Sequence, residues 1–257
     1  MTLTAPSPGW TLVLASASPA RRATLRSAGV EPVVRVSSVD EAAVLARTGV
    51  QDAARVPLLL ARAKAEDVAA TLNRNGGADG DADGNGNQGE GGTVVLGCDS
   101  ILDLDGVALG KPADPIQAVQ RWQQMRGRSG QLRTGHWLID LPSTAAGPST
   151  ATGPSSTAAG PSSTATGSWA AVGATSVTTV HFADLSDDEI QAYVRTGEPL
   201  NVAGAFTIDG LGGAFISGIE GDHHGVVGVS LPLLRELLGQ LGVPWTALWT
   251  AGASVPA

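Results

Sequence analysis

Hydrophobic and polar positions change their spacing several times along the first third of the chain, and each change predicts a new element. The first apolar run, residues 11–15, is short and continuous, as in a buried strand. Cap and turn residues then predict a helix over 18–28 and a strand over 33–38. A long helix is expected over 50–72. Strands and helices therefore alternate in this part.

The middle of the chain begins with a strand and a tight turn. An apolar strand is predicted over 93–104, and Asp105-Gly106 directly after it is a strong signal for a two-residue hairpin turn. A helix over about 114–125 and a strand over 131–140 follow.

The C-terminal part completes the pattern. A strand is expected over 170–182, and Ser186 with Glu189 three residues later forms a capping box, which predicts a helix start. The last helix is expected over 231–242. Strands that alternate with helices, with hairpins mixed in, predict an α/β protein with a mixed sheet.

Two stretches have almost no side chains that a core would bury. Residues 73–92 are nearly all Gly, Asn, Asp and Ala, and resemble a calcium loop, but their final Glu falls short of the twelve-residue spacing. We favour a flexible insertion there, and another over the Ser/Thr/Ala/Gly/Pro repeats of 142–168. With both set aside, one domain is expected, with an ordered core over 9–72, 93–141 and 169–249.

Composition and charge narrow the class of protein. The chain has 257 residues, of which 42% are hydrophobic, and a net charge of −8 that disfavours a nucleic-acid or anionic-membrane binder. Its apolar runs stay below the roughly 18 residues of a membrane span, and its first residues lack the pattern of a signal peptide. The single cysteine, Cys98, fits a reducing compartment. We therefore expect a cytoplasmic protein.

Two arginines stand where a helix disfavours cations. Ser18 is expected as the N-cap, so Arg21 and Arg22 fall in the first turn, where a cation costs about 0.3–1 kcal/mol. The free backbone N–H groups of such a turn favour a phosphate, and Ser16 can add a hydroxyl donor. A bound anion would offset the cost. The alternative is that both arginines point to solvent.

Asp99 interrupts the apolar strand over 93–104, and a carboxylate there is costly unless it is paired, binds a metal or takes part in chemistry. Counting back from the hairpin turn sets Ser100 opposite Lys111, with Asp99 one position away on the other face of the sheet. A bulge at Gly110 would bring them together. The alternative is a structural ion pair at a strand end.

Other charged residues are candidates on weaker grounds. Asp40 and Glu41 are expected to end a strand at the edge of a loop, where metal-binding carboxylates occur, although ordinary turn residues look the same. Only Lys64 and Lys111 among the 16 basic residues are lysines, which favours positions that need a compact ammonium. The alternative for Lys64 is a side chain that snorkels to solvent. Together the candidates point toward cleavage of a nucleotide phosphoanhydride.

Seven segments carry a resemblance to a known family. The chain resembles the Maf family of nucleoside triphosphate pyrophosphatases, which is related in fold to the inosine-triphosphate pyrophosphatases. The segments are LASASPARRATLRSAG, VSSVDE, LARAKA, GCDSILDLDGVALGKP, GRSGQLRTG, LSDDEIQAYVRTGEPLNVAGAF and IDGLGGAFISGIEGDHHGVVGVSLPLL. The resemblance implies a mixed twisted sheet with flanking helices and a central cleft. It also implies hydrolysis of a nucleoside triphosphate to the monophosphate and pyrophosphate, in house-cleaning of non-standard or excess nucleotides.

The same resemblance assigns the catalytic role and the residues of the cleft. Asp99, in the G-x-D-[ST] motif, is the expected proton acceptor. The resemblance also implies a divalent cation, Mg²⁺ or Mn²⁺, and Glu41, Lys64 and Lys111 match residues that line the family's cleft. Our mechanistic hypothesis is that Asp99 and Glu41 hold the cation, while Lys64 and Lys111, together with the two arginines, stabilise charge on the pyrophosphate.

The resemblance also assigns the substrate-binding residues. Ser16, Arg21 and Arg22 match the family's phosphate-binding turn. Ser100 and Asp209 are further expected substrate contacts.

The chain departs from the family at positions tied to the base. Members that prefer thymidine and uridine triphosphates carry Arg and Gln where this chain has Ala20 and Asp209, and members that prefer 7-methyl-GTP carry Trp and Glu. Asn201 and Val202 replace a common Asp-Lys pair, and Gly130 replaces a common His. The base preference therefore stays open.

Two other classes of function remain as alternatives. One is a non-catalytic nucleotide-binding regulator linked to septum formation; the other is a scaffold that uses residues 142–168 as an interaction arm. The family resemblance also suggests a homodimer.

Overall fold

A computed structural model describes residues 9–76, 92–141 and 169–250 of the chain. Within these ranges the strands form one seven-stranded sheet with the order β2-β1-β3-β5-β6-β7, and β4 pairs with β3 outside this path. The strands are β1 (Thr11–Leu14), β2 (Val33–Val34), β3 (Thr93–Leu104), β4 (Val107–Leu109), β5 (Ser129–Leu141), β6 (Ala171–Phe182) and β7 (Ile216–Glu220).

The sheet is mixed, as the sequence predicts. Strand β1 runs parallel to β2 and β3, whereas the β3-β5, β5-β6 and β6-β7 pairs are antiparallel. The hairpin turn after β3 is also confirmed: Leu104 pairs with Val107, and Asp105 and Gly106 both have positive φ, as a two-residue turn of this kind requires.

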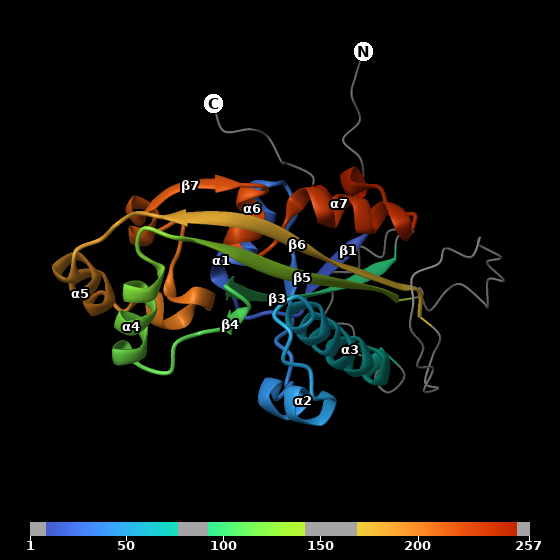
Figure 1. Ribbon diagram of the computed structural model, residues 1–257. Helices are drawn as coiled ribbons and strands as arrows, with labels where there is room; N and C mark the ends of the chain where they lie inside the picture. Colours follow the sequence, from blue (N-terminus) through green and yellow to red (C-terminus); the bar gives the residue numbers. More distant parts are fainter. Residues whose placement is uncertain (1–8, 77–91, 142–168, 251–257) are drawn as a thin grey trace, which may run out of the picture.

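Helices cover both faces of the sheet (Figure 1). The α-helices are α1 (Pro19–Ser27), α2 (Glu41–Thr48), α3 (Val56–Gly76), α4 (Pro115–Met125), α5 (Asp187–Arg195), α6 (His223–Val227) and α7 (Leu231–Gln240). Short 3₁₀ turns are η1 (Glu198–Asn201), η2 (Ala203–Ala205), η3 (Leu211–Phe215) and η4 (Trp245–Leu248).

Four hydrophobic clusters hold these layers together in the described residues, and the smallest of them joins α2 and α3 to Ile101 of β3. Leucines of α1 and α7 pack on one face of β1 and β3, while α3 packs on the opposite face. A third core joins α4 and α5 to the far ends of β3 and β6, around the fully buried Trp122. Because the two faces of β3 are covered by different helices, neighbouring residues of this strand meet different partners.

Helix α3 lies unusually close to the sheet. A Cβ atom added at Gly97 of β3 would lie 2.1 Å from the Ala61 carbonyl oxygen, and one at Gly135 of β5 would lie 2.4 Å from the Pro57 backbone. The two glycines therefore let the helix backbone approach the strands, which brings α3 side chains directly over the middle of β3.

Some expected boundaries were wrong. The strand expected over 33–38 ends at Val34, and a helix, α2, follows over residues for which no helix is expected from the sequence. The long helix begins at Val56 instead of residue 50 and continues to Gly76, into the segment expected to be a loop. The capping box of Ser186 and Glu189 is confirmed at the start of α5.

Most of the two expected insertions lies outside the described residues. None of the described helices is long and apolar enough to cross a membrane.

Candidate active site

Asp99 stands near the middle of β3, on the face that α3 covers. Its Oδ1 accepts a hydrogen bond from Nζ of Lys64 at 2.6 Å, and the Asp99 side chain is only 13% exposed. The close approach of α3 at Gly97 places Lys64 within reach.

Glu41 completes this group from a third element. Its Oε1 lies 2.7 Å from the Lys64 Nζ, so one ammonium joins two carboxylates. Glu41 is the first residue of α2 and not the end of a strand, because Asp40 caps the helix by accepting a hydrogen bond from the Ala43 N–H. The cap role of Asp40 leaves Glu41 as the carboxylate that faces the site.

The surroundings of Asp99 raise the pKa of its carboxyl, which suits this group to accept a proton. Burial raises the pKa of the Asp99 carboxyl, the Lys64 ammonium and the Arg21 guanidinium lower it by less, and the nearby Glu41 carboxylate raises it further. The pKa therefore stays above its usual value, which makes this carboxylate a stronger base than an exposed aspartate.

Arg21 lies on the opposite face of β3 and is bonded to the protein on several sides. Its Nε donates to the Gly228 carbonyl at 2.8 Å, and its Nη1 donates to the Ser16 hydroxyl and the Cys98 carbonyl, each at 3.0 Å. Its Nη2 donates to the Ser100 hydroxyl at 3.1 Å. The structure thus brings together Ser16, Arg21 and Ser100, but with Arg21 acting as a brace between segments.

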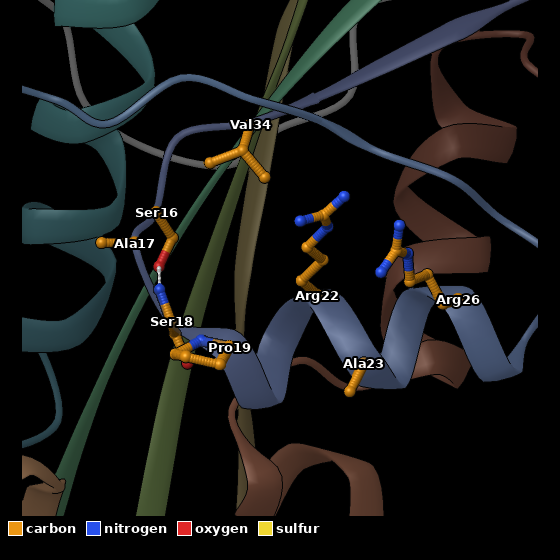
Figure 2. Close-up of a pocket in the computed structure, with 8 residues that line it drawn as sticks. All are labelled: Ser16, Ala17, Ser18, Pro19, Arg22, Ala23, Arg26 and Val34. Carbon is orange, nitrogen blue, oxygen red and sulfur yellow. Dashed lines mark hydrogen bonds between the residues drawn. The ribbon is translucent and has the colours of Figure 1, made fainter.

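Arg22 faces a different environment. It lines a cavity of about 360 Å³ beside the start of α1 (Figure 2). The lining residues are Ser16, Ala17, Ser18, Pro19, Arg22, Ala23, Arg26 and Val34. In Figure 2 the guanidinium groups of Arg22 and Arg26 lie on the same side of α1, which gives this cavity a cationic wall.

The charge of this wall is only partly balanced. Glu31 accepts from Arg22 Nη2 at 3.1 Å and from Arg26 Nε at 2.5 Å. All three side chains are 44–50% exposed, so these ion pairs hold the arginines weakly. The buried Nε of Arg22 has no partner among the described residues. The cavity can therefore accept an anion.

The expected pairing of Ser100 with Lys111 does not form. The ladder between β3 and β4 ends at the pair of Leu102 and Leu109, and Lys111 is exposed beyond it. The Gly110 carbonyl accepts instead from the Gly204 N–H, 3.0 Å away, in place of the suggested bulge. Asp99 and Ser100 do lie on opposite faces, as the strand pattern predicts.

Asp209 is exposed on a loop that Glu198 organises. Glu198 accepts hydrogen bonds from the Tyr193 hydroxyl and the Leu211 and Gly212 N–H groups, each at 2.9 Å, and from the Thr207 hydroxyl at 2.5 Å. No hydrogen bond or ion pair in the described ranges joins Asp209 or Lys111 to the Asp99 group. Asp99, Lys64 and Glu41 thus meet on one face of β3, and Ser16, Arg21 and Ser100 on the other. Lys111 and Asp209 are bonded to neither group in the described ranges.

A comparison with protein families agrees with the fold. A family model described as Maf-like protein matches residues 11–241. The chain belongs to the Maf family. The matched residues of this Maf chain include every strand of the described sheet.

Curated Maf relatives cover nearly the whole chain. The nucleoside triphosphate pyrophosphatase of Salinispora tropica is 49% identical over 243 residues, which are 95% of this chain and 89% of the relative. The protein of the same name from Streptomyces coelicolor is 48% identical over 244 residues, 95% of this chain and 97% of the relative. That from Nocardia farcinica is 48% identical over 240 residues, 93% and 96% respectively.

Proposed function

We propose that this chain hydrolyses nucleoside triphosphates to a nucleoside monophosphate and pyrophosphate. The observation that carries the proposal is the Asp99 carboxyl, whose pKa burial raises and which Lys64 holds in place at 2.6 Å. The cationic cavity at the start of α1 supports it, as do Maf relatives named nucleoside triphosphate pyrophosphatase.

Asp99 and Glu41 are the residues that would hold a divalent cation, Mg²⁺ or Mn²⁺. One oxygen of each carboxylate contacts the Lys64 ammonium. The second oxygen of each has no partner in the described ranges. Those ranges contain no group of three or more His, Cys, Asp or Glu side chains suited to a metal ion. Two carboxylates suit Mg²⁺, which in such sites takes further ligands from substrate phosphates and water. When bound, the cation would offset phosphate charge.

The proposed reaction is attack of water on the α-phosphorus. Asp99 accepts the proton of the attacking water, a new P–O bond forms, and the bond from the α-phosphorus to the α,β-bridging oxygen breaks. The electron pair of that bond leaves with pyrophosphate. Lys64 keeps the Asp99 carboxylate oriented, and Lys111 stabilises charge on the departing pyrophosphate.

The phosphates would bind at the start of α1. Arg22 and the backbone N–H groups of the first turn supply positive charge, while the Ser16 hydroxyl adds a polar contact at the edge of the cavity. Arg21 contributes by holding Ser16 and Ser100 in position. Asp209 and Ala20 would lie toward the base and set which nucleotide is preferred.

The proposed cellular role is house-cleaning of non-standard or excess nucleotides in the cytoplasm, by a homodimer. A test of the chemistry is a panel of standard and modified nucleoside triphosphates incubated with Mg²⁺ or Mn²⁺, with both products identified by chromatography. Equal amounts of monophosphate and pyrophosphate are expected. Release of orthophosphate and diphosphate would contradict attack at the α-phosphorus, and binding without turnover would favour the nucleotide-binding regulator.

A further inference from the structure

The backbone on both sides of Lys111 is held by two side chains of α4. On one side, Nη1 of Arg121 donates to the Gly110 carbonyl at 2.5 Å. On the other side, the Ala113 N–H donates to Oε1 of Gln117 at 2.9 Å. The chain from the end of β4 to α4 is therefore fixed immediately before and shortly after the lysine.

The two holding side chains also support each other. Gln117 and Arg121 are four residues apart on α4 and therefore share a face of the helix. Nη2 of Arg121 donates to the Gln117 Oε1 at 2.7 Å, so one amide oxygen accepts from both the helix partner and the loop.

Helix α4 is a rigid base for this arrangement. Asp114 caps it by accepting from the Gln117 N–H at 2.7 Å. Trp122, beside Arg121, is fully buried and donates from its indole nitrogen to the Ala205 carbonyl at 2.7 Å. A movement of the α4 backbone at Arg121 would therefore disturb the core.

The Gly110 carbonyl has a second donor, the Gly204 N–H of η2. Gly204 has φ +70°, and an added Cβ would lie 2.8 Å from the Leu102 side chain, so this contact is also tightly packed. Next to this fixed backbone, Pro112 is buried while Lys111 is exposed. The Lys111 ammonium has no hydrogen bond or ion pair with any of the residues described, so the backbone is constrained and the charge is available.

We propose that Arg121 and Gln117 are positioning residues that hold Lys111 for the departing pyrophosphate. The inference rests on the proposed function, in which Lys111 stabilises the leaving group. Pinning the backbone fixes the point from which the Lys111 side chain extends, so fewer chain conformations are lost when the transition state forms. Because the charge on the leaving oxygen develops during bond breaking, loss of this positioning lowers kcat more than it raises KM.

The test is a double-mutant cycle of Arg121→Met and Lys111→Ala, with kcat and KM measured for pyrophosphate release. Arg121→Met is expected to lower kcat about tenfold with KM changed less than about threefold. In the Lys111→Ala background the same change is expected to lower kcat less than about twofold, because the lysine it positions is gone. An equal loss of kcat in both backgrounds would overturn the inference.

Two further variants distinguish positioning from folding. Arg126→Met removes an arginine from the other end of the same helix, where it donates to the Leu185 carbonyl and to Asp187. This control is expected to lower Tm without coupling to Lys111. Gln117→Glu keeps an acceptor oxygen and should retain kcat, whereas Gln117→Leu should lower it; equal kcat values for these two would contradict the role of Gln117.

The cycle also separates this inference from the proposed function. If Lys111→Ala alone leaves kcat unchanged, the proposed role of Lys111 is wrong. If Lys111→Ala lowers kcat and Arg121→Met does not, only the positioning role is wrong.

Discussion

At the scale of single residues, the two adjacent arginines of α1 have different surroundings. Arg21 donates four hydrogen bonds to the protein, two of them to backbone carbonyls of residues far away in the sequence. Arg22 lies beside a cavity, with one ion pair to the half-exposed Glu31. One arginine thus braces the fold, and the other is available for an anion.

This difference predicts that the same substitution lowers stability at Arg21 and weakens substrate binding at Arg22. Arg21→Met should lower the free energy of unfolding by about 2–3 kcal/mol, because buried acceptors lose a charged donor. Arg22→Met should change stability by less than about 1 kcal/mol, since its ion pair is exposed, while raising KM for the triphosphate. Urea denaturation and steady-state kinetics of both variants measure this. A lower Tm and an unchanged KM for Arg22→Met would contradict the assignment.

Glu41, Lys64 and Asp99 show how far residue-level sequence reasoning extends. The carboxylate in an apolar strand marked Asp99 as unusual, but its partner Lys64 is 35 residues earlier, and no local pattern reports that contact. The helix start at Asp40 and Glu41 does have a local signal, an N-cap followed by an acid in the first turn, but acidic residues that follow a strand look the same in sequence.

At the scale of elements, a carboxylate organises the loop that carries Asp209. Glu198 accepts from the backbone at two positions and from two hydroxyl groups. An added Cβ at Gly210 would lie 2.6 Å from the Glu198 carboxylate, so the loop wraps closely around it. The sequence gives no sign of this role, since the donors come from residues 193–212 and meet only in the folded loop.

Glu198 makes stability depend on pH. Burial alone would raise the pKa of Glu198, but the hydrogen bonds it accepts outweigh burial and lower this pKa below its ordinary value of 4.5. A lowered pKa stabilises the fold above the ordinary value, and this contribution is lost as the pH falls through the lowered pKa.

The matching prediction concerns Glu198→Gln, which keeps an acceptor oxygen without the charge. At pH 7 the variant should be less stable by roughly 1–2 kcal/mol. The difference between native protein and variant should shrink as the pH falls below 4.5, the ordinary pKa of the group. Thermal unfolding at several pH values measures this difference. A gap that stays constant down to acidic pH would show that the charge is not what stabilises the loop.

At the scale of the whole molecule, the alternation of elements predicted the mixed sheet, and the motif order predicted the family. The place of Lys111 was not predicted, because the hairpin register was extended past the end of β4. The Gly110 carbonyl there bonds to Arg121 and Gly204, which come from other parts of the chain. The sequence thus predicts the strands and the candidate residues, whereas their grouping on the two faces of β3 depends on close packing at Gly97 and Gly135.

The central claim is that Asp99 is the proton acceptor in triphosphate hydrolysis. The most direct test is pyrophosphate release from a nucleoside triphosphate by the native protein and by Asp99→Asn, with Mg²⁺ present and folding checked by circular dichroism. The native protein should release pyrophosphate, and the folded variant should be slower by about 100-fold or more, the usual range for loss of a general base. A folded Asp99→Asn variant with the native rate would contradict the account.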